Sequence, residues 1–440
     1  MRAIEQLFSG FPQVEVPSGA RFSAHLKCEQ TDFVRFNQGL VRQSGHVDQA
    51  ECTFTLIQDG RQASMTINLG DDPAENLARM RQVVAQLAGI LPELAEDPHL
   101  LLPEGVQSSI DLPDLASDSL AQAVEDIAQS AQGLDLVGIL AQGPIGAAYI
   151  DSTGLQHAWQ RSLSLLDYSV YATGDKAFKK QVAGPVWDGV NFHSQLNEIR
   201  ERLPILFQPP KVLTPGTYRA WLTPAALGRI LGMASMDAFS YRAQQRRQSG
   251  LQRLLDGVGT LDSRISLSED VAGGTGPGFS EAGFAKPAKT ALLANGKHAS
   301  ALVNPRTARE YGVPTTGSGQ YEQPTSLSLA PGDLSKAEVL HNLDTGLWVD
   351  HLWYLNYSDR DACRITGMTR FATLWVENGV PVAPVNVMRF DDTLERMMGS
   401  ELEALGSEAE LCVNANSWGQ RSTESARLAG ALIRNWALTL

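Results

Sequence analysis

Hydrophobic residues recur along this chain at two spacings, one typical of helices and one typical of strands. Helical spacing begins after Asp72-Pro73, where Leu77, Met80 and Val84 would share one face of a helix that reaches about Gly89. Comparable patterns predict helices at about 119–131, at 190–202 and from about residue 223 onward. The longer apolar runs between them are rich in β-branched and aromatic residues and indicate strands.

Short turn signals join several of these strand-like runs. Asp59-Gly60 and Asn378-Gly379 each separate two such runs, and both pairs favour the positive φ angles of a two-residue hairpin turn. Runs of this kind occupy residues 22–68 and recur densely after residue 211. The pattern therefore predicts an α+β protein with much antiparallel pairing.

A proline-rich break divides the predicted elements into two groups. The segment LPILFQPPKVLTPG, residues 203–216, interrupts the pattern after the helix at 190–202. We expect an N-terminal α+β domain over 1–210, made of a sheet flanked by helices. The C-terminal domain, over 211–440, is expected to be rich in antiparallel β-strands.

Composition and charge narrow the classes of function. The chain has 440 residues, of which 43% are hydrophobic and 19% charged, as in folded globular proteins. Its net charge of −13 argues against binding of nucleic acids, which need a basic face. No apolar stretch is long enough to span a membrane, and MRAIEQLFSGFPQ does not resemble a secretory signal, so we expect a cytoplasmic location. Four widely spaced cysteines without a CxxC pair fit reduced thiols.

Common catalytic motifs are missing from the sequence. None of the eight histidines precedes a glutamate, and the closest pair, His341 and His351, is ten positions apart. Neither an HExxH nor an HExxxH zinc site can therefore form on one helix. GxSxG is absent, and the glycine-rich run 273–283 lacks the spacing of a phosphate-binding loop, so we interpret that run as a connection between strands.

One stretch resembles a known family. TGMTRFATLWVENG, residues 366–379, lies between LWVDHLWYLNYSDRDACRI and VPVAPVNVMRF. Together these residues resemble the C-terminal region of the TldD/PmbA family, also called TldD/TldE or modulators of DNA gyrase, whose catalytic members are metallopeptidases. VRFNQGLVRQ, residues 34–43, is similar to the N-terminal strand pair of that family. The resemblance implies that the N-terminal sheet is curved.

The resemblance also shows where a metal would be bound. Catalytic members hold it through an HExxxH element on a helix in the middle of the chain, helped by a C-terminal cysteine. The matching helix here begins near Thr223, and in its register Gly232 takes the first histidine position, Met233 the glutamate and Asp237 the second histidine. Cys412 corresponds to the cysteine, although the spacing to the following Gly-Gln differs. Gly232 and Met233 cannot bind a metal or act as a base.

The chain therefore resembles the metal-free, PmbA/TldE-like branch, and the resemblance implies a non-catalytic subunit. Such a subunit would have no cofactor of its own and would pair with a TldD-like catalytic subunit that holds zinc. Together they would enclose unfolded peptides. We name Trp353, Tyr354, Thr369 and Arg370 as candidate peptide contacts, with core packing and an ion pair as the alternatives.

Two other functions remain open at the level of sequence. One is a self-sufficient hydrolase that uses another metal or Cys363, which follows His351 in the same block. The other is a homodimeric peptide-binding protein without catalysis. Peptide cleavage by the purified chain alone would favour the first, and a neighbouring gene that encodes HExxxH would favour the paired peptidase over the second.

Overall fold

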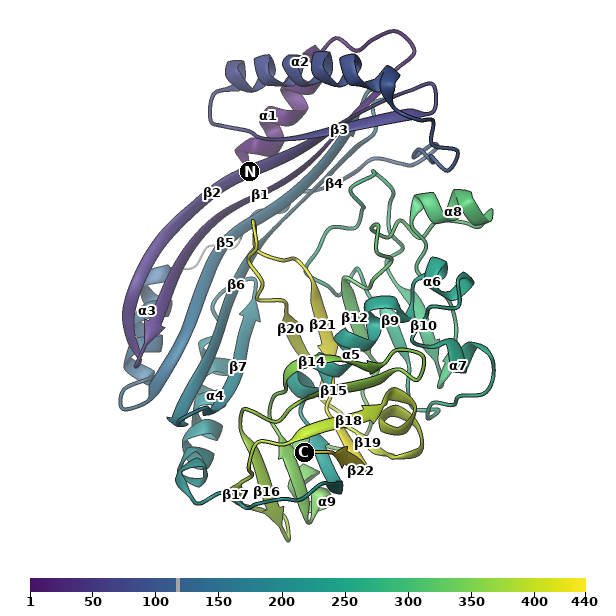
Figure 1. Cartoon of the computed structure of the whole chain (residues 1–440). Coiled ribbons are helices and arrows are strands. Elements are labelled where there is room, and N and C mark those ends of the chain that lie inside the picture. The colour runs from purple at the N-terminus through teal and green to yellow at the C-terminus, as the bar shows by residue number, and fades with distance from the viewer. Residues whose placement is uncertain (116–118) are drawn as a thin grey trace.

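The structure, a computed structural model, describes residues 1–115 and 119–440 (Figure 1). Within this part of the chain, strands pair into sheets of seven, six and nine strands, and helices cover them or lie between them. Most neighbouring strands are antiparallel; β4–β6, β8–β13 and β12–β21 are parallel. This architecture confirms the predicted α+β class.

The seven-stranded sheet is long and curved, as the family resemblance implied (Figure 1). Its order is β3-β2-β1-β5-β6-β4, with β7 also paired to β6. Its strands are β1 Arg21–Asn37, β2 Leu40–Gln58, β3 Arg61–Asn68, β4 Ser109–Asp111, β5 Asp135–Asp151, β6 Gln156–Thr173 and β7 Lys176–Gly184. The predicted hairpin is confirmed, because Asp59 and Gly60 join β2 to β3 with φ angles of 51° and 72°.

Helices pack against both ends of this sheet (Figure 1). They are α1 Arg2–Gly10, α2 Pro73–Ile90, α3 Leu120–Ser130 and α4 Gly189–Arg202, with short 3-10 turns η1 Phe11–Gln13, η2 Leu91–Glu93 and η3 Leu203–Phe207. The predicted start of α2 is confirmed: the Asp72 side chain caps it by accepting from the backbone N–H of Ala74. None of the described helices is long and apolar enough to cross a membrane.

The nine-stranded sheet contains strands from both ends of the C-terminal half. Its order is β14-β15-β18-β22-β8-β13-β16-β17, and β19 also pairs with β22. The strands are β8 Gly216–Leu222, β13 Gly346–Val349, β14 Trp353–Asp359, β15 Arg364–Met368, β16 Thr373–Glu377, β17 Val380–Pro384, β18 Arg389–Thr393, β19 Leu402–Leu405 and β22 Ala431–Leu438. Asn378 and Gly379 form the predicted turn between β16 and β17, with φ angles of 50° and 77°.

The six-stranded sheet faces the nine-stranded one, and helix α5 lies between them (Figure 1). Its strands, in the order β11-β10-β9-β12-β21-β20, are β9 Leu267–Glu269, β10 Thr290–Ala294, β11 Lys297–His298, β12 Ser326–Leu329, β20 Glu410–Val413 and β21 Ser425–Leu428. The remaining helices are α5 Pro224–Ala238, α6 Tyr241–Gln245, α7 Gln252–Leu255, α8 Pro305–Tyr311 and α9 Val339–Leu343, with 3-10 turn η4 Lys336–Glu338 and π turn η5 Arg396–Ser400. Buried leucines of α5 share one apolar core with both sheets.

A second apolar core crosses the predicted domain boundary near residue 210. It joins Phe192 of α4 and Tyr168 of β6 to Trp348 of β13 and Leu374 of β16. The seven-stranded sheet ends before this boundary, and β8 opens the nine-stranded sheet after it. The two parts share buried contacts across the boundary. The division into 1–210 and 211–440 stays a prediction.

Candidate functional site

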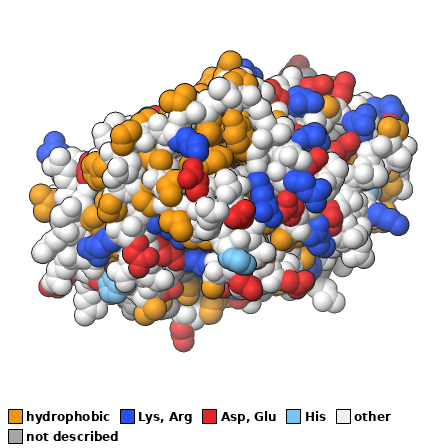
Figure 2. Space-filling model, turned by 90° about the horizontal axis from the view of Figure 1, so that it is seen from below, with side chains coloured by type: hydrophobic (Ala, Val, Ile, Leu, Met, Phe, Trp, Pro, Cys, Tyr) orange, Lys and Arg blue, Asp and Glu red, His pale blue; other side chains and the backbone are white. Residues whose placement is uncertain are grey.

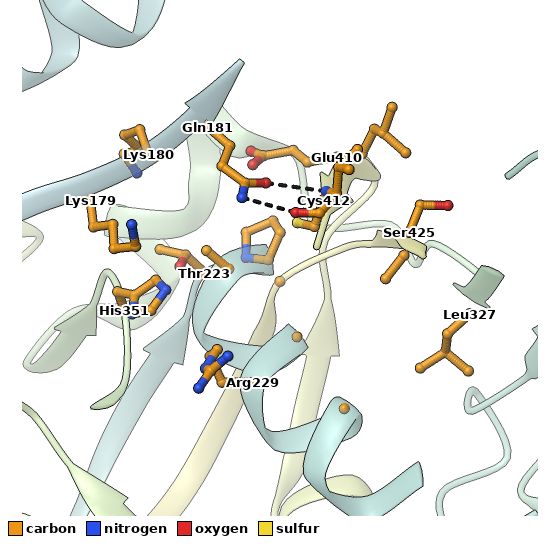
Figure 3. A pocket seen from close by; sticks show the side chains of 18 of the residues that line it. Lys179, Lys180, Gln181, Thr223, Arg229, Leu327, His351, Glu410, Cys412 and Ser425 are labelled. Carbon is orange, nitrogen blue, oxygen red and sulfur yellow. Dashed lines mark hydrogen bonds between the residues drawn. The ribbon is translucent and has the colours of Figure 1, made fainter. Parts of the chain in front are cut away.

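A cavity of about 590 Å³ lies where the first sheet meets the two later sheets. One wall comes from β7, another from the first turns of α5, and a third from β20 and β21 (Figure 3). The lining combines charged, amide and apolar side chains. Such a mixed concave surface is typical of binding sites for small molecules and peptides.

Helix α5 is positioned by its amino-terminal cap. Thr223 Oγ1 accepts from the N–H of Ala226 at 3.3 Å and donates to the carbonyl oxygen of Asp350 at 2.6 Å, which ties the helix start to the end of β13. One face of α5, including Leu227 and Ile230, is buried in the core. The opposite face borders the cavity through Ala225, Gly228, Arg229, Gly232, Ser235 and Met236.

The three positions that match the family's metal motif point in different directions. Gly232 lines the cavity, and a Cβ added there would meet no atom within 4 Å. Met233 packs against the core, and its carbonyl accepts from Tyr357 Oη at 2.9 Å. Asp237 pairs with Arg360. Space for a histidine thus exists at the first position, whereas the other two side chains have structural contacts.

These residues do not fit a metal ion. Gly232 has no side-chain donor, Met233 faces the core, and Asp237 is already bound to a guanidinium. Across the described ranges, 1–115 and 119–440, no group of three or more His, Cys, Asp or Glu side chains could hold a metal.

Cys412, which corresponds to the family's cysteine, lies on the wall formed by β20 (Figure 3). Burial, and next the nearby Glu410 carboxylate, raise the pKa of this thiol to about 12. Cys412 is therefore a neutral thiol near pH 7. The structure brings Cys412 and Gly232 to one cavity, as the resemblance implied, but without a ligand set.

A glutamine attaches this wall to the first sheet. Gln181 of β7 donates from Nε2 to the carbonyl oxygen of Val413 at 2.9 Å, and its Oε1 accepts from the Val413 N–H at 3.1 Å (Figure 3). The amide therefore bonds to β20 much as a neighbouring backbone would. Nothing in the local sequence indicates this contact, because Gln181 and Val413 are far apart along the chain.

The loop that follows β20 is attached to the first sheet by Arg421. Its guanidinium donates to the carbonyl oxygens of Ala141, Leu163 and Gly143 at 3.1, 2.9 and 2.7 Å. The same side chain pairs with the buried Glu29 of β1 at 3.5 Å. The cavity wall thus depends on contacts between the beginning and the end of the chain.

The four candidate peptide contacts differ in accessibility. Trp353 lines the cavity and is half-exposed, and the Arg370 guanidinium lies over its ring at 5.0 Å. Tyr354 is exposed on β14, an edge strand of the nine-stranded sheet. Thr369 is fully buried and exchanges two hydrogen bonds with the backbone of Met388, so a direct contact with a peptide is not open to it. Roles for the other three stay predictions.

Cys363 does not have the environment of a nucleophile. It is buried, and this burial, followed by the charge of Glu395, raises the pKa of its thiol to about 12. A nucleophilic cysteine needs a lowered pKa and access to substrate. Its burial and raised pKa therefore fit a packing residue better than a catalytic nucleophile.

Comparison with known proteins places the chain in a family. Residues 215–437 match the model described as the PmbA/TldA metallopeptidase C-terminal domain. No curated protein matches the chain.

Three solved structures share its fold over nearly their whole length. TldE from Thermococcus kodakarensis has a TM-score of 0.78 at 14% identity, with 100% of both chains covered. A protein titled putative modulator of a DNA gyrase from Thermotoga maritima has a TM-score of 0.74 at 13% identity, covering 100% of this chain and 99% of that one. A protein titled putative modulator of DNA gyrase from Bacteroides thetaiotaomicron has a TM-score of 0.70 at 16% identity, covering 100% and 97%.

The fold and the matched domain define a protein related to metallopeptidases, built on the same scaffold as TldE. The family model covers half of the sequence, and the resemblance seen in the sequence is thereby confirmed. The chain belongs to the PmbA/TldD family.

Proposed function

We propose that this chain is a non-catalytic subunit of a peptidase, which binds unfolded peptides and pairs with a TldD-type subunit that holds the metal. The observation that carries the proposal is the cavity-facing side of α5. It has Gly232 where a catalytic member has a histidine, while Met233 and Asp237 are engaged in contacts of their own.

The cavity itself supports a role in binding. About 590 Å³ is kept open between three walls although the metal ligands are missing. Its lining offers aromatic surface from Trp348 and Trp353 and a polar group from Arg229. A peptide can use both, because its backbone needs hydrogen-bond partners and its side chains need apolar surface.

An exposed apolar surface supports pairing with another subunit. Figure 2 shows hydrophobic side chains gathered over part of the face that is turned down in Figure 1. Exposed residues near this end come from β17 and from the segment beside it: Phe207, Val212, Val380 and Val382. Gathered apolar side chains on a surface are typical of protein interfaces.

The proposal is tested by co-purification and peptide hydrolysis. The tagged chain would be co-expressed with a family member from the same genome that carries HExxxH. We expect the two to purify together, and the pair, but not this chain alone, to cleave an unfolded peptide. Replacing the glutamate of the partner's HExxxH by glutamine should abolish cleavage without separating the pair.

Matched variants test the surface. Val380→Asp combined with Val382→Asp should weaken co-purification, because it places charge in an apolar contact. Val41→Asp, which changes an equally exposed valine on β2, should not. Cleavage by this chain alone, or stoichiometric zinc in it, would refute the proposal. A homodimer that binds peptide and ignores the HExxxH protein would favour the stand-alone binding protein instead.

A further inference from the structure

Arg229 carries the unpaired positive charge on the α5 side of the cavity. Lys179 donates to Asp167 at 2.7 Å, and Lys180 donates to the buried Asp350 at 2.6 Å. The exposed guanidinium of Arg229 has no ion pair or hydrogen bond within residues 1–115 and 119–440. The two lysines are thus neutralised locally, and Arg229 leaves this wall with one positive charge in excess.

An imidazole beside Arg229 also lacks a partner. Nδ1 of His351 is buried and makes no hydrogen bond of good geometry in the described ranges, although the Leu352 backbone lies beside the ring. Burial, followed by the charges of Lys179 and Arg229, lowers the pKa of His351 to about 3. His351 is therefore uncharged near pH 7, and Figure 3 shows it between Lys179 and Arg229. A buried ring nitrogen without a partner needs an explanation, and a ligand group would supply one.

The beginning of α5 contributes a third donor. Thr223 Oγ1 accepts from Ala226, and the carbonyl of Thr223 accepts from Leu227. The N–H of Ala225, the second residue of the helix, has no acceptor in the described part of the chain, and Ala225 lines the cavity. Free N–H groups and the dipole at the start of a helix favour negative charge.

We propose that Arg229, His351 Nδ1 and the first turn of α5 bind the C-terminal carboxylate of a peptide in this cavity. A guanidinium and a carboxylate match as planar groups that can form two parallel hydrogen bonds. A single excess positive charge suits a monoanion better than a phosphate dianion, since Asp167 and Asp350 already offset both lysines. The inference rests on the proposed role in peptide binding, and it specifies the site at which the C-terminus of the peptide is bound.

The surroundings favour a peptide over a free inorganic anion. The cavity lining also includes Met236, Leu327 and Trp348, which offer apolar surface to the residues before the carboxylate. The opposite wall carries further carboxylates, among them the exposed Glu410, which has no ion pair within the described ranges. A second carboxylate would therefore be repelled there, which favours one defined orientation of the chain.

Binding of two peptides to the purified chain tests the inference. The probes are N-acetyl-trialanine with a free C-terminal carboxylate and the same peptide with a C-terminal amide, titrated by calorimetry or NMR. We expect the acid to bind at least roughly tenfold more tightly, as the loss of one charge-assisted contact would predict. Inorganic phosphate, as a competitor, should displace the acid poorly.

Variants assign the effect to Arg229. Arg229→Gln should weaken binding of the acid to the level of the amide and leave the amide unchanged, and Arg229→Lys should keep part of the preference. Arg42→Gln, on the exposed tip of β2, serves as the matched control and should change neither affinity. Because Arg229 is exposed, its variants are expected to fold, which an unchanged melting temperature would verify.

Four results would overturn the inference: equal affinity for acid and amide, an unchanged preference in Arg229→Gln, no binding of either probe, or phosphate competing as well as the acid. The proposed function is judged separately, by co-purification with the HExxxH protein. A pair that assembles and cleaves peptide without any preference for the acid would end this inference alone. Failure to form an active pair would refute the proposed function.

Discussion

At the scale of single residues, burial decides which side chains can take part in chemistry. Cys363 and Cys412 differ in position, one packed in the core and the other at the cavity, yet burial raises the pKa of both thiols to about 12. Near pH 7 neither is a thiolate, so neither suits the hydrolase alternative. His351 shows the same effect with the opposite sign, since burial keeps the neutral form of a base.

His351 should make the protein less stable in acid. Its pKa is about 3 in the folded state and 6.5 when exposed, so below pH 6.5 the unfolded chain takes up a proton that the folded chain does not. The free energy of unfolding therefore falls as the pH is lowered from 6.5 towards 3. Between pH 7 and pH 5 this one group should cost about 2 kcal/mol.

Urea unfolding at pH 7 and at pH 5 measures this cost. His351→Gln should reduce the difference between the two pH values, whereas His341→Gln, at an exposed position, should leave it unchanged. Part of the acid sensitivity will persist in His351→Gln, because the pKa of His25 is likewise lowered by burial, to about 4. An undiminished difference in His351→Gln would contradict the assignment.

At the scale of elements, the sequence predicts the start of a helix or the turn of a hairpin wherever a few neighbouring residues determine it. The Asp72 and Thr223 caps, and the Asp59-Gly60 and Asn378-Gly379 turns, act within a few residues and were predicted correctly. The contact between β7 and β20 was not predicted. This contact depends on the Gln181 side chain, which bonds to the backbone of Val413. The two residues are far apart in the sequence, and hydrophobic periodicity contains no information about such a pair.

Gln181 should hold β20 in place. Gln181→Leu removes both hydrogen bonds to Val413 and leaves the Val413 N–H without a partner. We expect a loss of about 1–3 kcal/mol in stability and faster hydrogen exchange at the Val413 amide. Gln132→Leu, at an exposed position of the first half, is the control. Equal exchange at Val413 in both variants would show that Gln181 does not support this strand.

The candidate site could be predicted in part. The resemblance led to Gly232 and Cys412, and both line the cavity. Arg229 is not among the predicted site residues, although it precedes Gly232 by about one helical turn and so shares its face, a signal available in the sequence. For His351 the sequence suggests only a partnership with Cys363. The position of His351 beside α5 depends on the parallel pairing of β8 with β13, two strands far apart in the sequence, which sequence patterns do not reveal.

At the scale of the whole molecule, Arg421 links the last part of the chain to the first sheet. Arg421→Met would leave the carboxylate of Glu29 buried without its cation and would free three carbonyl oxygens. Loss of one partner of a buried pair costs about 3–5 kcal/mol, and we expect a decrease of that size in urea unfolding.

Arg427→Met provides the comparison, because Arg427 is an exposed arginine only a few residues away on β21. If both variants lost the same stability, the link to the first sheet would contribute little. Adding Glu29→Gln to Arg421→Met should recover part of the loss, since the unpaired charge is then removed.

The position of β22 has a consequence for biosynthesis. This strand pairs with β8 on one side and with β18 and β19 on the other, so it lies inside the nine-stranded sheet. A ribosome makes β8 long before β22, and during that interval the neighbouring strand edges have no partner to pair with. Unpaired edges attract other chains. The nascent polypeptide is therefore most prone to aggregate until β22 has been made, which is when a chaperone would help it most.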